Sequence, residues 1–128
     1  MRRLLSEHRL FSARQNDAEK YVVLTREPVP TTGAELLAAF EEFARTLDPS
    51  HRSYGLILDV RNVVGNNNPE FEQSANEIVV RAHRYFKRVV VVLTSAAGAL
   101  QAKRLNGTRS DKVIVARDMI EAIALATH

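Results

Sequence analysis

The sequence predicts an α/β fold with a single-layer mixed sheet, in one domain over residues 1–128. From Thr32 onward, short apolar runs alternate with amphipathic runs of helical spacing. Such alternation is typical of parallel strands joined by right-handed helical crossovers. Before Thr32, two strand-like runs flank a polar turn, which predicts an N-terminal antiparallel hairpin. The expected order is therefore β-β-α-β-α-β-α-β-α.

The hairpin strands are expected over Leu4–Ala13 and Tyr21–Thr25, which are the first two stretches with strand-like composition. The polar residues 15–18 between them predict the turn. Pro28 and Pro30 end the second strand, because proline has no backbone N–H to contribute to a sheet ladder.

The first helix is expected to begin at a capping box formed by Thr32 and Glu35, whose side chains each satisfy a free backbone amide. Asp48-Pro49 is expected to end it, because the residue before a proline disfavours the helical conformation. One apolar face recurs at spacings of three and four residues, and consists of Leu36, Leu37, Phe40, Phe43, Ala44 and Leu47.

The middle of the chain predicts two buried strands with a helix between them. Tyr54–Val60 is the first strand, and Arg88–Thr94, which is apolar on both faces, is a central strand covered on both sides. The intervening helix has an apolar face made of Phe71, Ala75, Ile78, Val79, Ala82 and Phe86. We expect one contiguous cluster from these elements, containing Leu58, Ile78, Val90 and Val92.

The remaining elements are a third helix, a last strand and a terminal helix. The third helix is expected over Ala96–Leu105, and Asn106-Gly107 is a typical left-handed helix stop. The last strand is expected over Lys112–Ala116. Asp118 and Glu121 then form a second capping pair, which opens a helix that runs through Leu125.

Composition excludes several kinds of site. Cysteine is absent, so disulfides, thiolate metal sites and cysteine nucleophiles are excluded. The four histidines are too dispersed to form a metal motif, and we expect no metal and no cofactor. No apolar run approaches the roughly 18 residues that a membrane span needs, and the N-terminus does not resemble a signal peptide. The expected location is therefore cytoplasmic, with no membrane partner.

The net charge of +3 and the pI near 9.6 raise the question of nucleic-acid binding. The densest group of basic residues lies at the end of the second helix, and comprises Arg81, His83, Arg84, Lys87 and Arg88. Acidic residues at the start of a helix and basic residues at its end complement the helix macrodipole. No aromatic residues interleave with these cations as a stacking platform would require, so we expect no nucleic-acid partner.

The candidate functional site follows the strand that ends at Asp59. A buried strand of a parallel sheet delivers its last residue to the carboxyl edge, where open α/β folds bind ligands and partners. A loop containing Gly65 and three asparagines follows this acid. The candidate partner- or ligand-binding residues are Asp59, Arg61, Asn66, Asn67, Asn68, Thr94 and Ser95.

Each candidate also has a purely structural interpretation. Asp59 can accept hydrogen bonds from its own loop. The asparagines can serve as turn formers, with Asn67 or Asn68 capping the next helix. Thr94 or Ser95 can cap the third helix; in the functional alternative they form an anion or phosphate pocket beside Asp59.

A family resemblance is carried by the strand LILDV, the loop and helix expected after it, and the run RVVVVLTSAAGALQAKRL. These features resemble the STAS superfamily, in particular its stand-alone bacterial domains similar to the sporulation anti-sigma-factor antagonist. The resemblance covers nearly the whole chain and lies in element order and hydrophobic pattern. It implies a non-enzymatic regulatory module that acts in transcription regulation and signalling. The implied partner is a protein, such as an anti-sigma-factor-like kinase, and a homodimer is a further expectation.

In the switch members of this family, a loop after the strand-end Asp presents a Ser or Thr that the partner kinase phosphorylates. Asp59 matches the strand-end acid, but no Ser or Thr lies between Arg61 and Phe71. The resemblance therefore implies partner binding without the usual phosphorylation switch. The alternative function is a domain that binds a small anion, nucleotide or lipid at the carboxyl edge of the sheet.

Two other classes fit the sequence less well. Response-regulator receivers also end successive strands in Asp and Thr, but they need an acidic pair after the first strand and a Lys after the last, and this chain has Arg117 there. An enzyme would need a nucleophile–base pair or two converging carboxylates, which no spacing in the sequence indicates. We therefore expect no catalytic residue.

Overall fold

The computed structural model describes residues 2–61, 69–93 and 114–128, and its centre is one six-stranded sheet. The strands are β1 (Arg3–Glu7), β2 (Phe11–Asn16), β3 (Tyr21–Arg26), β4 (Gly55–Asp59), β5 (Arg88–Val92) and β6 (Ile114–Ala116). They lie side by side in chain order. β1, β2 and β3 pair antiparallel, and β3 through β6 pair parallel. The mixed α/β sheet predicted from the sequence is confirmed.

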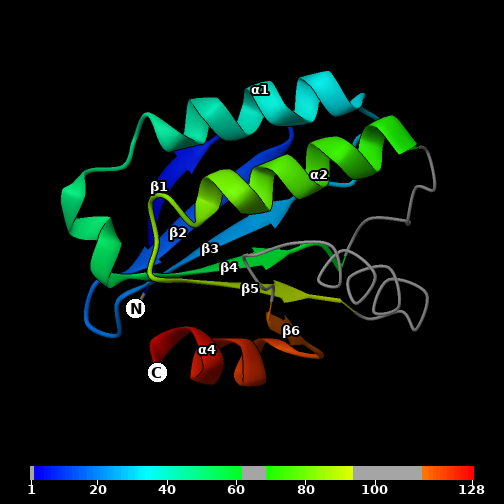
Figure 1. Cartoon of the computed structure of the whole chain (residues 1–128). Helices are drawn as coiled ribbons and strands as arrows, with labels where there is room; N and C mark the ends of the chain where they lie inside the picture. The colour runs from blue at the N-terminus through cyan, green and yellow to red at the C-terminus, as the bar shows by residue number, and fades with distance from the viewer. Residues whose placement is uncertain (1, 62–68, 94–113) are drawn as a thin grey trace.

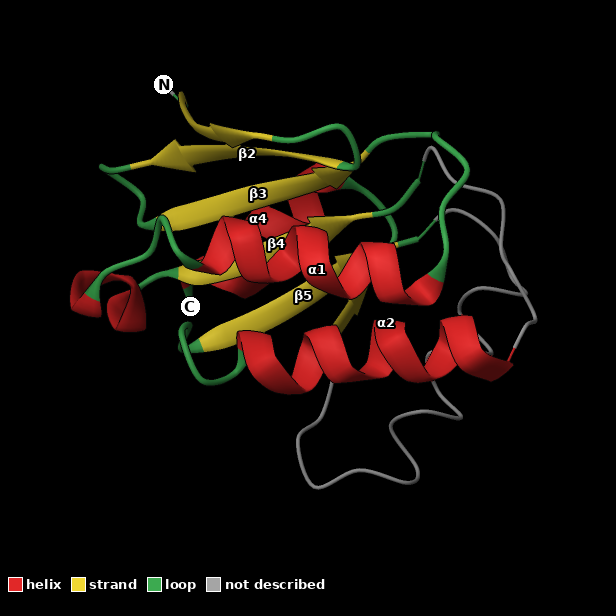
Figure 2. Cartoon of the chain, turned by 90° about the horizontal axis from the view of Figure 1, so that it is seen from above, coloured by secondary structure: helices red, strands yellow, loops and turns green. Residues whose placement is uncertain are grey.

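Helices cover both faces of this sheet (Figure 1). α1 (Gly33–Ala44) and α2 (Pro69–Ala82) lie on one face, and α4 (Met119–Thr127) lies on the opposite face. Figure 2 shows α1 and α2 packed beside each other above the sheet. The expected third helix, Ala96–Leu105, lies outside the described residues. The short 3₁₀ helix η1 (Pro49–Ser53) precedes β4.

The N-terminal region contains one strand more than the sequence predicts. The run Leu4–Ala13 is not one strand but parts of β1 and β2, joined by a tight turn. In this turn the backbone N–H of His8 donates to the carbonyl of Phe11 at 2.7 Å, and His8 Nδ1 accepts from the N–H of Leu10 at 3.0 Å. The histidine side chain thus stabilises a turn that has no Gly, Pro or Asn to mark it.

The predicted capping box at the first helix is confirmed, because Thr32 Oγ1 accepts from the N–H of Glu35 and the Glu35 carboxylate accepts from the N–H of Thr32. The end of the helix differs from the prediction, since α1 stops at Ala44. Asp48 instead caps η1, with Pro49 at its first position, where the missing N–H costs no hydrogen bond.

The sheet divides the core into two clusters. Leu58 and Ile78 belong to the cluster beneath α1 and α2, whereas Val90 and Val92 pack against α4. The expectation that these four residues form one cluster is therefore wrong, because successive residues of a strand point to opposite faces. β5 has buried residues on both faces, as predicted for Arg88–Thr94.

Candidate functional site

Asp59 is the last residue of β4, at the carboxyl edge of the sheet, where the sequence places it. In the sheet it lies between Thr25 of β3 and Val92 of β5, and only 6% of its surface is exposed. Ile57, two residues earlier, packs on the α4 side, so Asp59 faces the same side. A buried carboxylate requires a partner, because removing an unpaired charge from water is costly.

Arg61 is that partner. Its Nε donates to Asp59 Oδ1 and its Nη2 to Oδ2, both at 2.9 Å, and its backbone N–H adds a third bond to Oδ1 at 3.2 Å. Burial by itself raises the pKa of Asp59, but the hydrogen bonds and charge of Arg61 outweigh this effect and hold the pKa below its usual value. Asp59 is therefore an ionised and fully hydrogen-bonded acid.

The Arg61 side chain is one-third exposed, so it connects the buried acid to the surface. The hydrogen bonds that Arg61 donates to Asp59 raise the pKa of Arg61, and the charge of Asp118 adds to this effect. Asp118 follows β6 and caps α4 by accepting from the N–H of Glu121 at 2.8 Å. The sequence predicts Asp118 only as a cap, although its place soon after the last strand is a signal for the carboxyl edge.

The other predicted site residues, Asn66, Asn67, Asn68, Thr94 and Ser95, lie outside the described residues. The anion pocket that Thr94 and Ser95 would complete stays a prediction. Among residues 2–61, 69–93 and 114–128, no group of three or more His, Asp or Glu side chains is placed to hold a metal ion.

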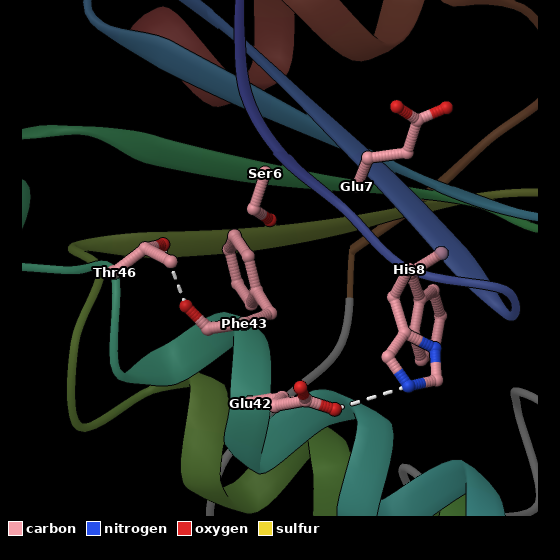
Figure 3. Close-up of a pocket in the computed structure, with 7 residues that line it drawn as sticks. Ser6, Glu7, His8, Glu42, Phe43 and Thr46 are labelled. Atoms are coloured by element: carbon pink, nitrogen blue, oxygen red, sulfur yellow. Dashed lines mark hydrogen bonds and ion pairs between the residues drawn. The ribbon is translucent and has the colours of Figure 1, made fainter.

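A half-open pocket of about 160 Å³ lies between β1 and α1, away from Asp59. Figure 3 shows the ring of Phe43 beneath Ser6, while His8 and Glu42 point toward one another across the opening. His8 Nδ1 accepts from the N–H of Leu10, so the ring proton is on Nε2. This Nε2 donates to Glu42 Oε2 at 3.0 Å. These two groups satisfy each other, and the Glu7 carboxylate points away from the pocket.

A buried polar network at the opposite, amino edge of the sheet was not foreseen. His51 and Gln15 are both buried, and Gln15 Nε2 donates to Asp17 Oδ1 at 2.6 Å. Arg3 donates to Asp17 at 2.8 Å, and Tyr54 donates to it at 3.4 Å. The sequence predicts only a hairpin turn at Gln15 and Asp17, and no local signal indicates that Gln15 Oε1 lies 2.8 Å from His51 Nε2.

Comparison with known proteins finds no matching family model, no matching curated protein and no matching solved structure. The geometry at the carboxyl edge is therefore the basis for a functional assignment. Among the described segments, no helix has the length and apolar character that crossing a bilayer requires.

Proposed function

We propose that this chain is a non-enzymatic regulatory module that binds a protein partner at the carboxyl edge of its sheet. The observation that carries the proposal is the Asp59–Arg61 pair. Asp59 anchors the guanidinium of Arg61 by two parallel hydrogen bonds, so that the cation is held in one orientation at the surface. Arginine is enriched among the residues that dominate the energetics of protein interfaces.

The free edge of Arg61 supports this role. A guanidinium has five N–H donors, and the bonds to Asp59 use one from Nε and one from Nη2. Within the described part of the chain, Nη1 has no hydrogen-bond partner. The outer edge of Arg61 can therefore receive a carboxylate or a carbonyl oxygen of a partner without disturbing Asp59.

The state of Asp59 favours binding over catalysis. A general acid must carry a proton at the working pH, but Asp59 has a lowered pKa and is ionised. A nucleophile or base needs a free lone pair aimed at the substrate, whereas both Asp59 oxygens accept from Arg61. The acid thus supports the position of Arg61.

The same proposal includes the role implied by the STAS resemblance, an antagonist of an anti-sigma-factor-like protein in transcription regulation. Its support is the acid at the end of β4 with α2 as the next described element, together with the mixed sheet. Because residues 62–70 contain no Ser or Thr, partner binding would be constitutive rather than switched by phosphorylation of this loop.

The test begins with the wild-type chain as bait in a lysate of its host, followed by calorimetry with each purified partner. Arg61→Gln should weaken a genuine complex by about tenfold, because one central arginine contributes on the order of 1–2 kcal/mol. Arg14→Gln, on an exposed β2 position, is the matched control and should bind normally. Circular dichroism of both variants confirms that folding is intact.

Two outcomes contradict the interaction module. In one, Arg61→Gln leaves the affinity of every captured partner unchanged. In the other, inorganic phosphate or a nucleotide binds the wild type at micromolar levels. Arg61→Gln abolishes the binding of that small ligand but leaves the affinity for every protein partner unchanged. The second outcome would favour the small-ligand function at the same edge.

A further inference from the structure

The amino edge of the sheet, where the parallel strands begin, carries a group of four basic residues. Arg52 lies in η1, Arg84 and Lys87 lie between α2 and β5, and Arg88 opens β5. We call Arg52, Arg84, Lys87 and Arg88 the basic cluster. Three of the four are exposed and Arg88 is half-buried.

Two backbone contacts and one side-chain contact hold the cluster together. The N–H of Lys87 donates to the carbonyl of Tyr54 at 3.0 Å, and Arg88 is paired with Gly55 in the parallel ladder. The guanidinium of Arg52 donates to the carbonyl of Arg84. Residues 54–55 and 87–88 therefore lie about one strand spacing of 4.8 Å apart, and the Arg52 side chain reaches across to Arg84. Figure 1 shows both segments at the same end of the sheet.

The arginines of the described residues divide into those with an acidic partner and those without one, and the cluster shares the second group with Arg2, Arg14, Arg26 and Arg45. Arg3, Arg9, Arg61, Arg81 and Arg117 each form an ion pair with an Asp or Glu. Within the described residues, no carboxylate lies within 4.0 Å of a cation of the basic cluster. The guanidinium groups of the cluster donate to neutral carbonyls instead: Arg52 donates to the carbonyl of Arg84, and Arg88 donates to the carbonyl of Leu125.

The helix macrodipole accounts for only part of this arrangement. Arg88 donates to the carbonyl of Leu125 near the end of α4 at 3.3 Å, which is a helix-terminus contact. Arg81, in the last turn of α2, is already paired with Glu41 and Glu77. Arg84 and Lys87 lie beyond that turn, so their exposed charges add to the cluster without compensation.

Carboxylates limit the width of this positive surface. The N–H of Gly55 donates to the carbonyl of Lys20, which places the β2–β3 turn and its exposed Glu19 beside the start of β4. On η1, the exposed Asp48 precedes Arg52 by one turn. Duplex nucleic acid would need a broad positive surface, since specific complexes neutralise about 6–10 phosphates. A short acidic segment fits four cations flanked by acids better.

We propose that the basic cluster binds a short acidic segment of a protein partner. This surface lies at the edge of the sheet opposite Asp59 and Arg61, so it does not depend on the function proposed for them. Binding would be electrostatically steered and sensitive to salt, because exposed charges are screened beyond about 8 Å at physiological ionic strength.

The test measures fluorescence anisotropy of a labelled oligoglutamate peptide with the full chain, at low and at physiological ionic strength. The wild type should bind at low salt and lose affinity as salt rises. Arg84→Glu should weaken binding by roughly fivefold to tenfold, because charge reversal removes one attraction and adds one repulsion. Arg14→Glu has the same net charge and lies outside the cluster, so it should retain most of the affinity.

A second readout locates the contact. Amide signals of residues 52–55 and 84–88 should shift in NMR spectra on peptide addition, while those of Asp59 and Arg61 stay fixed. Equal losses in Arg84→Glu and Arg14→Glu would show that only net charge matters and would overturn the proposal. Tighter binding of mixed-sequence duplex DNA than of oligoglutamate, lost in Arg84→Glu, would also overturn it in favour of nucleic acid.

Discussion

Gly55, the first residue of β4, lies directly against Ala126, near the end of α4. A Cβ atom at Gly55 would come within 2.8 Å of the Ala126 Cβ and even closer to the Ala126 carbonyl oxygen. The absence of a side chain at position 55 therefore lets α4 pack onto the start of the sheet. Ala126 is fully buried in the cluster on that face.

Gly55→Ala is accordingly expected to destabilise the domain by about 1–3 kcal/mol, the usual cost of overpacking against backbone that cannot move aside. Urea unfolding followed by circular dichroism measures this loss. Gly33→Ala is the matched control, because Gly33 lies in the first turn of α1 and has no positive φ. Equal unfolding midpoints for the two variants would contradict the close approach of α4.

The next prediction concerns the hydrogen bond between His51 and Gln15. Because His51 Nδ1 accepts from the N–H of Asp48 at 3.0 Å, Nε2 carries the proton and donates to Gln15 Oε1 at 2.8 Å. Gln15→Leu leaves this buried donor without an acceptor. The free energy of unfolding should therefore fall by about 1–3 kcal/mol, which urea unfolding measures.

A double variant separates the hydrogen bond from simple packing. The centre of the His51 ring lies 5.2 Å from the centre of the Tyr54 ring and 6.0 Å from that of the Phe86 ring. A phenyl ring at position 51 therefore suits these aromatic surroundings. Gln15→Leu combined with His51→Phe should recover part of the lost stability, since neither buried group then lacks a partner. Additive losses in the double-mutant cycle would argue against the bond.

Asp17 is expected to control part of the acid unfolding of the domain. Hydrogen bonds from Arg3 and then Gln15 lower the pKa of Asp17 to about 2. A carboxyl group whose pKa is lower in the folded state stabilises the fold above its unfolded pKa of about 3.9. This contribution should disappear as the pH falls from about 4 to about 2.

Asp17→Asn tests this pH dependence, because the amide does not titrate. The variant should be less stable than the wild type at neutral pH, and the difference should shrink toward zero near pH 2. Urea midpoints measured across this range give the answer. A difference that is the same at pH 7 and at pH 2 would exclude linkage through the Asp17 charge.

Arg61→Ala should reveal how much the pair with Asp59 stabilises the fold. Without the Arg61 side chain, burial of Asp59 is opposed only by the backbone N–H of residue 61 and the charge of Arg2, so the pKa of Asp59 should be higher than in the wild type. The stability that Asp59 provides above its unfolded pKa is then lost at neutral pH, at a cost of roughly 1–3 kcal/mol. Arg61→Lys keeps the positive charge but not the two parallel N–H donors, so it should lose less stability than Arg61→Ala.

Carboxyl NMR titration of Asp59 reports the underlying change directly. The wild type should titrate below the usual range for aspartate, and Arg61→Ala should titrate above the wild type. If the two proteins titrate at the same pH, Arg61 does not determine the ionisation of Asp59. Unfolding measurements alone could not separate that case from a loss of packing.

Local signals explain which parts of the fold the sequence could predict. The capping box of Thr32 and Glu35 and the double-sided burial of β5 depend on nearby residues alone, and both are present. The turn between β1 and β2 was missed because a His8 side chain, rather than a glycine or proline, stabilises it.

The candidate site shows the same division. The position of Asp59 follows from the apolar run before it, and the structure places it at the carboxyl edge as predicted. The amide bond from Arg61 agrees with the expectation that Asp59 accepts from its own loop, but the ion pair with the Arg61 side chain was not predicted, because residues two apart can adopt many relative orientations. The burial of Gln15 depends on His51, which is 36 residues away, and no local pattern carries that information.

The agreement between strand order and chain order has a consequence for biosynthesis. Each strand from β2 to β6 pairs with the strand made just before it. During translation, each of these described strands therefore leaves the ribosome with its neighbour already available, and none of the six must be inserted between two others. The six described strands can thus be added in one direction, each to the edge formed by the strand before it.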